Sequence, residues 1–112
     1  MSHISTHVLD TSRGKPAAGV PVVLAHAVNG VFVEIARADT NADGRIPELT
    51  KPGTLAVGTW RIRFDTATYF RATDQKGFYP LIEIVFDVLD VSQNHHVPLL
   101  LNPFGYSTYR GS

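Results

Sequence analysis

Short runs of strand-forming residues recur along this chain, and each run is closed by turn residues. In residues 58–64, Trp60, Ile62 and Phe64 fall on one face of an extended strand and two arginines fall on the other. Side chains of a β-strand point alternately to opposite faces, so this spacing predicts a strand with one buried face. Comparable runs predict strands at residues 3–10, 19–28, 31–37, 82–88, 97–101 and from residue 106 onward. Seven or eight short strands predict an all-β Greek-key β-sandwich.

Local signals define one hairpin and one helix. Asn29 and Gly30 stand between two apolar runs. This pair is typical of the type I′ turn of a β-hairpin, which needs positive φ at both central residues. Asp65 is a good N-cap for a short helix over residues 66–72, with Gly77 ending the segment. The sequence therefore predicts a hairpin around residues 29–30 and a single short helix.

Composition excludes several classes of protein. Ten basic residues balance ten acidic ones without any basic cluster, so the footprint of a nucleic-acid-binding protein is missing. The absence of cysteine excludes disulfides, a thiolate nucleophile and cysteine-ligated zinc. No signal-like segment or apolar run of membrane-spanning length occurs, so we expect a cytoplasmic protein without a membrane partner. With 112 residues, we expect a single domain over residues 1–112.

Two of the predicted strands, residues 20–28 and 97–101, are apolar on both faces. A small sandwich buries only one face of each sheet, so the outer face of such a strand is expected to meet another subunit. The alternative is that a long loop or the helix covers that face. The pattern favours an oligomer.

The histidines are the natural candidates for acid–base chemistry near neutral pH. His26 lies in an apolar run, where a histidine is more often a packed core residue than a catalyst. His95 and His96 are adjacent on a strand, so they point to opposite faces and cannot both serve one site. The neighbouring residues give little ground for assigning the functional role to His95 or to His96. His7 lies among small polar neighbours and fits a functional or a structural role equally well.

Asp39 to Gly44 resembles the start of an EF-hand calcium loop. However, Thr50 stands at position twelve, where a bidentate glutamate is needed, and Pro47 interrupts the loop. We therefore expect a turn here instead of a calcium site. The turn presents Arg45, either as a solvated surface side chain or as a clamp for an anion.

Zinc binding is not favoured by the histidine spacing. His3 and His7 are four residues apart, which is about 13 Å along a strand, so they cannot chelate one ion together. A zinc site would need His7, His96 and a third ligand brought together by the fold. We predict a metal-free site.

Motifs at both ends of the chain resemble one family. Residues 5–17 read STHVLDTSRGKPA, residues 96–101 read HVPLLL, and residues 106–112 read YSTYRGS. These motifs are similar to those of the 5-hydroxyisourate hydrolases, which are related to transthyretin, and the resemblance covers essentially the whole chain. It implies a transthyretin-like Greek-key β-sandwich.

The resemblance also implies an activity and a site. The activity is hydrolysis of 5-hydroxyisourate to 2-oxo-4-hydroxy-4-carboxy-5-ureidoimidazoline in urate catabolism, with no cofactor. The implied catalytic residues are His7, Arg45 and His96. The implied substrate-binding residues form the C-terminal tetrapeptide, namely Tyr109, Arg110, Gly111 and Ser112. The implied assembly is a homotetramer, a dimer of dimers, with its sites where the dimers meet.

The family pattern leaves some questions of mechanism open. Either His7 or His96 could be the base that activates water, and either the hydroxyl or the terminal carboxylate of Ser112 could assist. The main alternative is a non-catalytic carrier of a small aromatic ligand, like transthyretin itself. Because a carrier does not need paired histidines, the pattern favours the enzyme.

Overall fold

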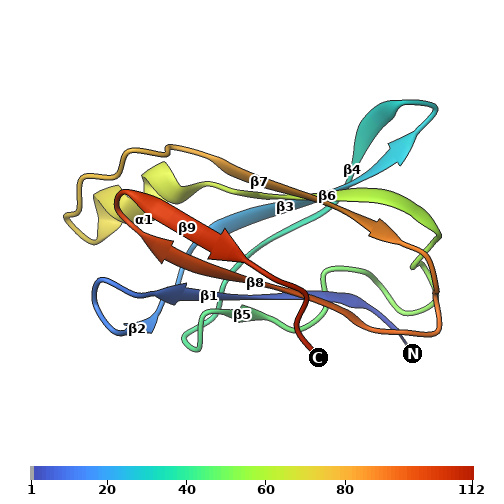
Figure 1. Cartoon of the computed structure of the whole chain (residues 1–112), viewed down its shortest axis with the longest axis horizontal. Coiled ribbons are helices and arrows are strands. Elements are labelled where there is room, and N and C mark those ends of the chain that lie inside the picture. Colours follow the sequence, from blue (N-terminus) through green and yellow to red (C-terminus); the bar gives the residue numbers. More distant parts are fainter. Residues whose placement is uncertain (1) are drawn as a thin grey trace.

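The protein is a sandwich of two β-sheets with one short helix at one end, as the computed structural model shows for residues 2–112 (Figure 1). The described elements, in chain order, are β1 (Ile4–Asp10), β2 (Lys15–Pro16), β3 (Pro21–Val28), β4 (Val31–Asp39), β5 (Arg45–Ile46), β6 (Gly58–Phe64), α1 (Thr66–Ala72), β7 (Ile82–Val88), β8 (His95–Asn102) and β9 (Gly105–Thr108). The predicted all-β sandwich with one helix is confirmed. The two additional strands, β2 and β5, are two residues long and too short to show an alternating pattern.

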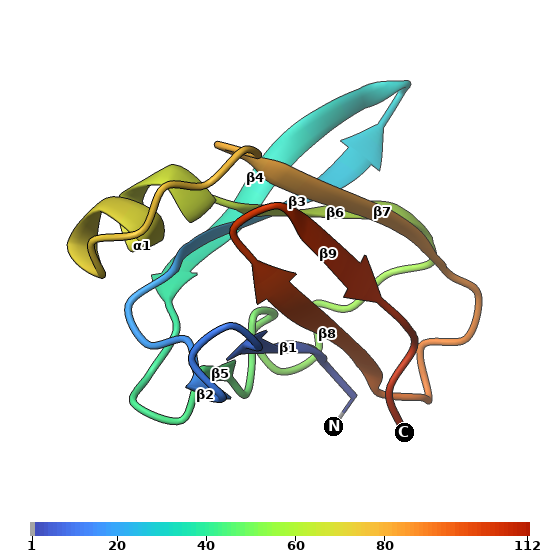
Figure 2. The same ribbon diagram turned by 60° about the vertical axis from the view of Figure 1, so that its left-hand side comes forward.

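The order of the strands brings the two ends of the chain together. One sheet has the order β2-β1-β8-β9, with β5 also pairing with β1, and the other has the order β4-β3-β6-β7. β1 and β8 run parallel, with Ser5 opposite His96 and His7 opposite Pro98. The turned view shows β1 and β8 side by side, with β9 and the C-terminal tail next to them (Figure 2). The strands that carry His7 and His96 are therefore neighbours.

The core lies between the two sheets and follows the predicted alternation. Trp60, Ile62 and Phe64 of β6 are buried, and they face buried residues of the opposite sheet such as Val8 and Leu99. Burying one large apolar side chain stabilises the fold by about 1.5–3 kcal/mol. The residues of β1 that alternate with its buried ones, including Ser5 and His7, are only half-buried on the outer face. The core thus orients the polar residues of β1 outward.

The hairpin and the helix begin where the sequence predicts. Asn29 and Gly30 have φ values of 52° and 79°, as a type I′ turn requires. The side chain of Asp65 caps α1 by accepting a hydrogen bond of 3.1 Å from the Thr68 N–H. The helix ends at Ala72, and Gly77 follows only after an intervening loop. No helix in residues 2–112 is long and apolar enough to cross a membrane.

The strand predicted to be buried on both faces, β3, is only partly buried on its outer face within a single chain. Val22 and Leu24 are buried between the sheets, whereas on the outer face Ala25 is buried and Val23 and Ala27 remain partly exposed. The reason is that a two-layer sandwich offers no third layer to cover an outer face. β8 differs, because only His96, Leu100 and Asn102 are half-buried and the other five residues of the strand are buried.

Candidate functional site

The register of β1 and β8 places His7 and His96 on the same outer face of the first sheet. In a parallel pair, residues opposite each other point to the same side, so His96 shares a face with Ser5 and therefore with His7 two residues further on. The two histidines are diagonal neighbours, with Cα atoms about 8 Å apart by strand spacing and rise. Both side chains are half-buried.

A turn places Arg45 next to His7. Arg45 is the first residue of β5 and lies opposite His7 in the antiparallel pairing with β1. The Oδ1 atom of Asn41 accepts hydrogen bonds from the backbone N–H groups of Asp43 (2.9 Å) and Arg45 (3.0 Å). The turn is attached to β1 because Val8 donates its N–H to the Gly44 carbonyl at 2.7 Å. The calcium-like stretch is thus a turn, and its side-chain oxygen from Asn41 fixes the backbone that presents Arg45.

Electrostatics keep both histidines in the neutral form. The pKa of His7 is lowered from its ordinary value of 6.5 by burial and then by the positive charge of Arg45, although Asp43 acts in the opposite direction. The pKa of His96 is lowered by burial, then by Arg45 and by His7. Arg45 thus acts on both rings. A neutral imidazole can accept a proton, so each ring is prepared to act as a base at neutral pH.

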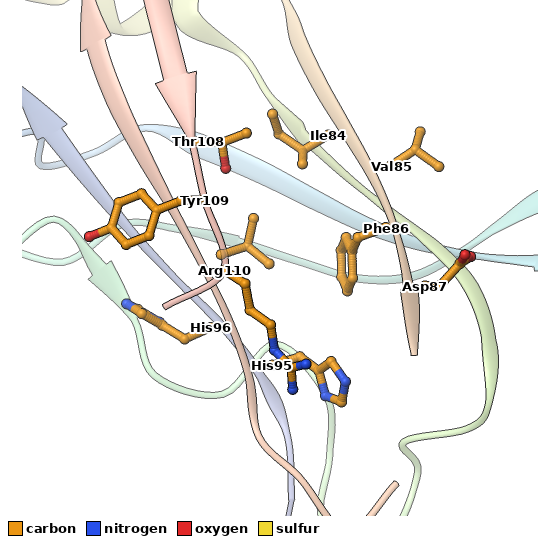
Figure 3. A pocket seen from close by; sticks show the side chains of 10 residues that line it. Ile84, Val85, Phe86, Asp87, His95, His96, Thr108, Tyr109 and Arg110 are labelled. Atoms are coloured by element: carbon orange, nitrogen blue, oxygen red, sulfur yellow. The ribbon is translucent and has the colours of Figure 1, made fainter. Parts of the chain in front are cut away.

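Residues of the C-terminal tail take different positions relative to His96. Gly111 donates its N–H to the His96 carbonyl at 2.8 Å, so the tail runs beside that residue. Arg110 points the other way, toward His95, and donates to the Gln93 side chain at 3.0 Å (Figure 3). Tyr109 is 58% exposed. The structure therefore brings Gly111 to the predicted cluster, and it places Arg110 with His95 instead.

His95 faces the interior, opposite to His96, as the alternation predicts. Its side chain is only 4% exposed, and its pKa is lowered by burial and then by the charge of Arg110. It lines a cavity of about 250 Å³ between β7 and the β8–β9 hairpin (Figure 3). Ile84, Phe86 and Val97 also line this cavity, whereas His7 and Arg45 do not. His96 and Tyr109 line it as well, so the cavity adjoins the cluster on the outer face.

The structure also shows where His26 lies and whether side chains are grouped to hold a metal ion. His26 lies in the other sheet and stacks on Trp60, with ring centroids 4.1 Å apart and planes 13° from parallel. It packs against the core, as predicted. Among residues 2–112, no group of three or more histidine, cysteine, aspartate and glutamate side chains is placed to hold a metal ion.

Sequence reasoning missed the role of Ser5. Its Oγ atom lies 2.8 Å from Nδ1 of His96. The signal in the sequence was weak, because Ser5 was visible only as a small polar neighbour of His7 on the same face. Its partner is 91 residues away in the chain, and only the register of β1 against β8 identifies it.

The arrangement suits hydrolysis of a small electrophilic substrate. A neutral imidazole can take a proton from water, the imidazolium that forms can give it to a leaving group, directly or through a second imidazole, and a guanidinium can stabilise a developing oxyanion. Arg45 can also bind an anionic substrate. These three functions need no covalent intermediate.

Comparisons with known proteins agree over nearly the whole chain. A family model described as the HIUase/Transthyretin family matches residues 4–111. The chain is 43% identical over 113 residues to 5-hydroxyisourate hydrolase of Mus musculus, covering 99% of this chain and 96% of that protein. The solved 5-hydroxyisourate hydrolase of Klebsiella pneumoniae has 36% identity and a TM-score of 0.86, with 100% of both chains covered. Sea bream transthyretin, solved in complex with thyroxine, has 29% identity and a TM-score of 0.90, covering 96% of this chain and 93% of that one.

Proposed function

Because this chain belongs to the HIUase/transthyretin family, we propose that it is a 5-hydroxyisourate hydrolase. The reaction opens the six-membered ring of 5-hydroxyisourate and gives 2-oxo-4-hydroxy-4-carboxy-5-ureidoimidazoline, a step of urate catabolism. The observation that carries the proposal is the convergence of His7, Arg45 and His96 on one outer face. That convergence supplies two neutral bases and a cation at one place.

The proposed mechanism uses the side chains of this chain alone. One imidazole takes a proton from water as its oxygen attacks a ring carbonyl, and Arg45 stabilises the oxyanion that forms. The bond between that carbon and the ring nitrogen then breaks, and the proton taken from water passes from the imidazolium to the leaving nitrogen, with the other imidazole orienting the water or relaying the proton. Gly111 and the rest of the tetrapeptide complete the substrate pocket in this proposal. No cofactor takes part.

The assembly belongs to the same proposal. Within one chain the site is an open surface, with Tyr109 and Arg45 exposed beside it. β7 and β9 each lie at an edge of their sheet and pair with a neighbouring strand on one side only. Exposed edges of this kind pair readily with other chains. Large apolar side chains such as Phe104, which is 75% exposed, also favour a partner. We infer a homotetramer, a dimer of dimers, that closes the site where two dimers meet.

The decay of 5-hydroxyisourate tests the proposed function. The substrate is generated in situ from urate with urate oxidase, and its ultraviolet absorbance is followed with wild-type protein and with buffer alone. We expect the protein to accelerate decay well above the buffer rate. Decay at the buffer rate by a folded oligomer would contradict the hydrolase, and binding of thyroxine without turnover would then support the carrier.

A further inference from the structure

The side chain of His96 is held on both flanks. Ser5 Oγ lies 2.8 Å from Nδ1, on one flank of the ring. On the other flank the backbone of Gly111 comes so close that a Cβ there would lie 2.5 Å from Cδ2 and 3.2 Å from Cγ. Nδ1 and Cδ2 are the two ring atoms bonded to Cγ, so these contacts hold the ring near its base. Nε2, at the far end of the ring, is left for the substrate.

The two contacts come from opposite ends of the chain and are fixed by backbone pairing. Ser5 lies opposite His96 in the parallel β1–β8 ladder. Gly111 donates its N–H to the His96 carbonyl at 2.8 Å. Any side chain at position 111 would have to displace the imidazole, because 2.5 Å is shorter than a normal carbon–carbon contact of about 3.5–4.0 Å. The glycine is therefore required by its distance from the ring.

We propose that Ser5 and Gly111 are positioning residues that fix both the orientation and the tautomer of His96. In this arrangement the Nδ1–H group donates to Ser5 Oγ, and Nε2 presents its lone pair to the attacking water. The proposal rests on the proposed function and assigns His96 as the proton acceptor within it.

The tautomer follows from the contact at Nδ1 and from the role of Nε2. A serine hydroxyl can accept or donate a hydrogen bond, so the contact with Ser5 by itself allows either form of the ring. A general base needs a free lone pair, and Nε2 has one only when the proton is on Nδ1. In the proposed arrangement the proton is therefore on Nδ1, where Ser5 Oγ can accept it.

Imidazole nitrogen NMR tests the tautomer without using activity. In protein labelled with ¹⁵N-histidine, with His96→Gln used to assign the signals, we expect wild-type His96 to be a single tautomer protonated at Nδ1. Ser5→Ala should shift the His96 signals toward the Nε2–H form, and Ser5→Thr, which keeps the hydroxyl, should restore the wild-type signals. A wild-type ring protonated at Nε2, or a tautomer unaffected by Ser5→Ala, would overturn the proposal.

Kinetics with matched variants test the consequence. Ser5→Ala should lower kcat about 10- to 100-fold while KM changes by less than about threefold, because misplacing a base affects the chemical step. Gly111→Ala should lower kcat by a similar factor, since its Cβ would displace the ring. Gly105→Ala is the control for Gly111, since a Cβ at Gly105 would meet only the Asn102 side chain, at 3.7 Å. It should keep wild-type kcat. Wild-type kcat in folded Ser5→Ala or Gly111→Ala would contradict the positioning role.

The two proposals fail in different ways. If wild-type protein does not accelerate decay of 5-hydroxyisourate, the proposed function fails, although the NMR signals still report whether Ser5 sets the His96 tautomer. If wild-type protein is active and Ser5→Ala is equally active with an unchanged tautomer, only the positioning role fails.

Discussion

At the scale of single residues, the lowered pKa values of His7 and His96 predict the pH dependence of activity. Burial and Arg45 lower both values below 6.5, so each ring is less than half protonated at pH 6.5. We therefore expect the midpoint of the acidic limb of kcat/KM to lie below pH 6.5. An acidic limb centred at or above pH 6.5 would contradict this. In Arg45→Gln, NMR titration should give higher pKa values for both rings, because a positive charge is removed.

The sequence predicted the site residues to different extents. Local patterns indicated His7 and Arg45 as candidates. His7 fitted a structural role equally well, and Arg45 also fitted a solvated surface side chain. The choice of His96 over His95 needed the family resemblance, because adjacent strand residues differ only in the face they occupy. The structure supplies the missing reason, since His95 lies inside the sandwich and is only 4% exposed. The direction of Arg110 could not be predicted, because it depends on a contact with Gln93 in a loop.

At the scale of elements, a buried carboxylate joins β1 to α1. Asp10 is 1% exposed, and its Oδ2 atom accepts a hydrogen bond of 2.6 Å from the Tyr69 hydroxyl. Burial alone would raise the pKa of Asp10, but hydrogen bonds from Tyr69, Ser12, Gln75 and the Arg13 N–H lower it. Burial and Asp10 together raise the pKa of Tyr69 to about 12, so the phenol remains a donor.

This network predicts the effect of one substitution. Tyr69→Phe leaves the buried carboxylate with one partner fewer and should lower the free energy of unfolding by about 1–3 kcal/mol. Urea denaturation followed by circular dichroism measures this change. Tyr79→Phe is the matched control, because Tyr79 is 39% exposed and lies outside the network. Equal stability of the two variants would show that the network does not stabilise the fold.

The elements were largely predictable because periodicity is a local signal. Alternation identified β6 and β7, and the Asn29–Gly30 turn fixed the hairpin between β3 and β4. The parallel pairing of β1 with β8 was not predicted from these local patterns, since it joins segments about 90 residues apart. That pairing creates the site. Local patterns therefore predicted the strands, whereas the register between distant strands, which assembles the candidate site, is seen only in the structure.

At the scale of the whole molecule, activity should depend on assembly. Light scattering should give the mass of four chains of 12.3 kDa, which is about 49 kDa. Dilution that dissociates the assembly should lower specific activity while circular dichroism shows that each chain stays folded, because the site is open in a single chain. Full activity in a verified monomer would contradict the shared site. The cytoplasmic location stays a prediction.

The central claim is that His7 and His96 act in one site, and a double-mutant cycle on hydrolysis of 5-hydroxyisourate tests it most directly. Wild type, His7→Ala, His96→Ala and the double variant are compared by kcat/KM, with His26→Ala as a control in the other sheet. Residues that act as a unit are strongly non-additive. We expect each single variant to lose about 10²–10⁴-fold and the double variant to lose little more. Losses that multiply, or a single variant with wild-type activity, would contradict the account.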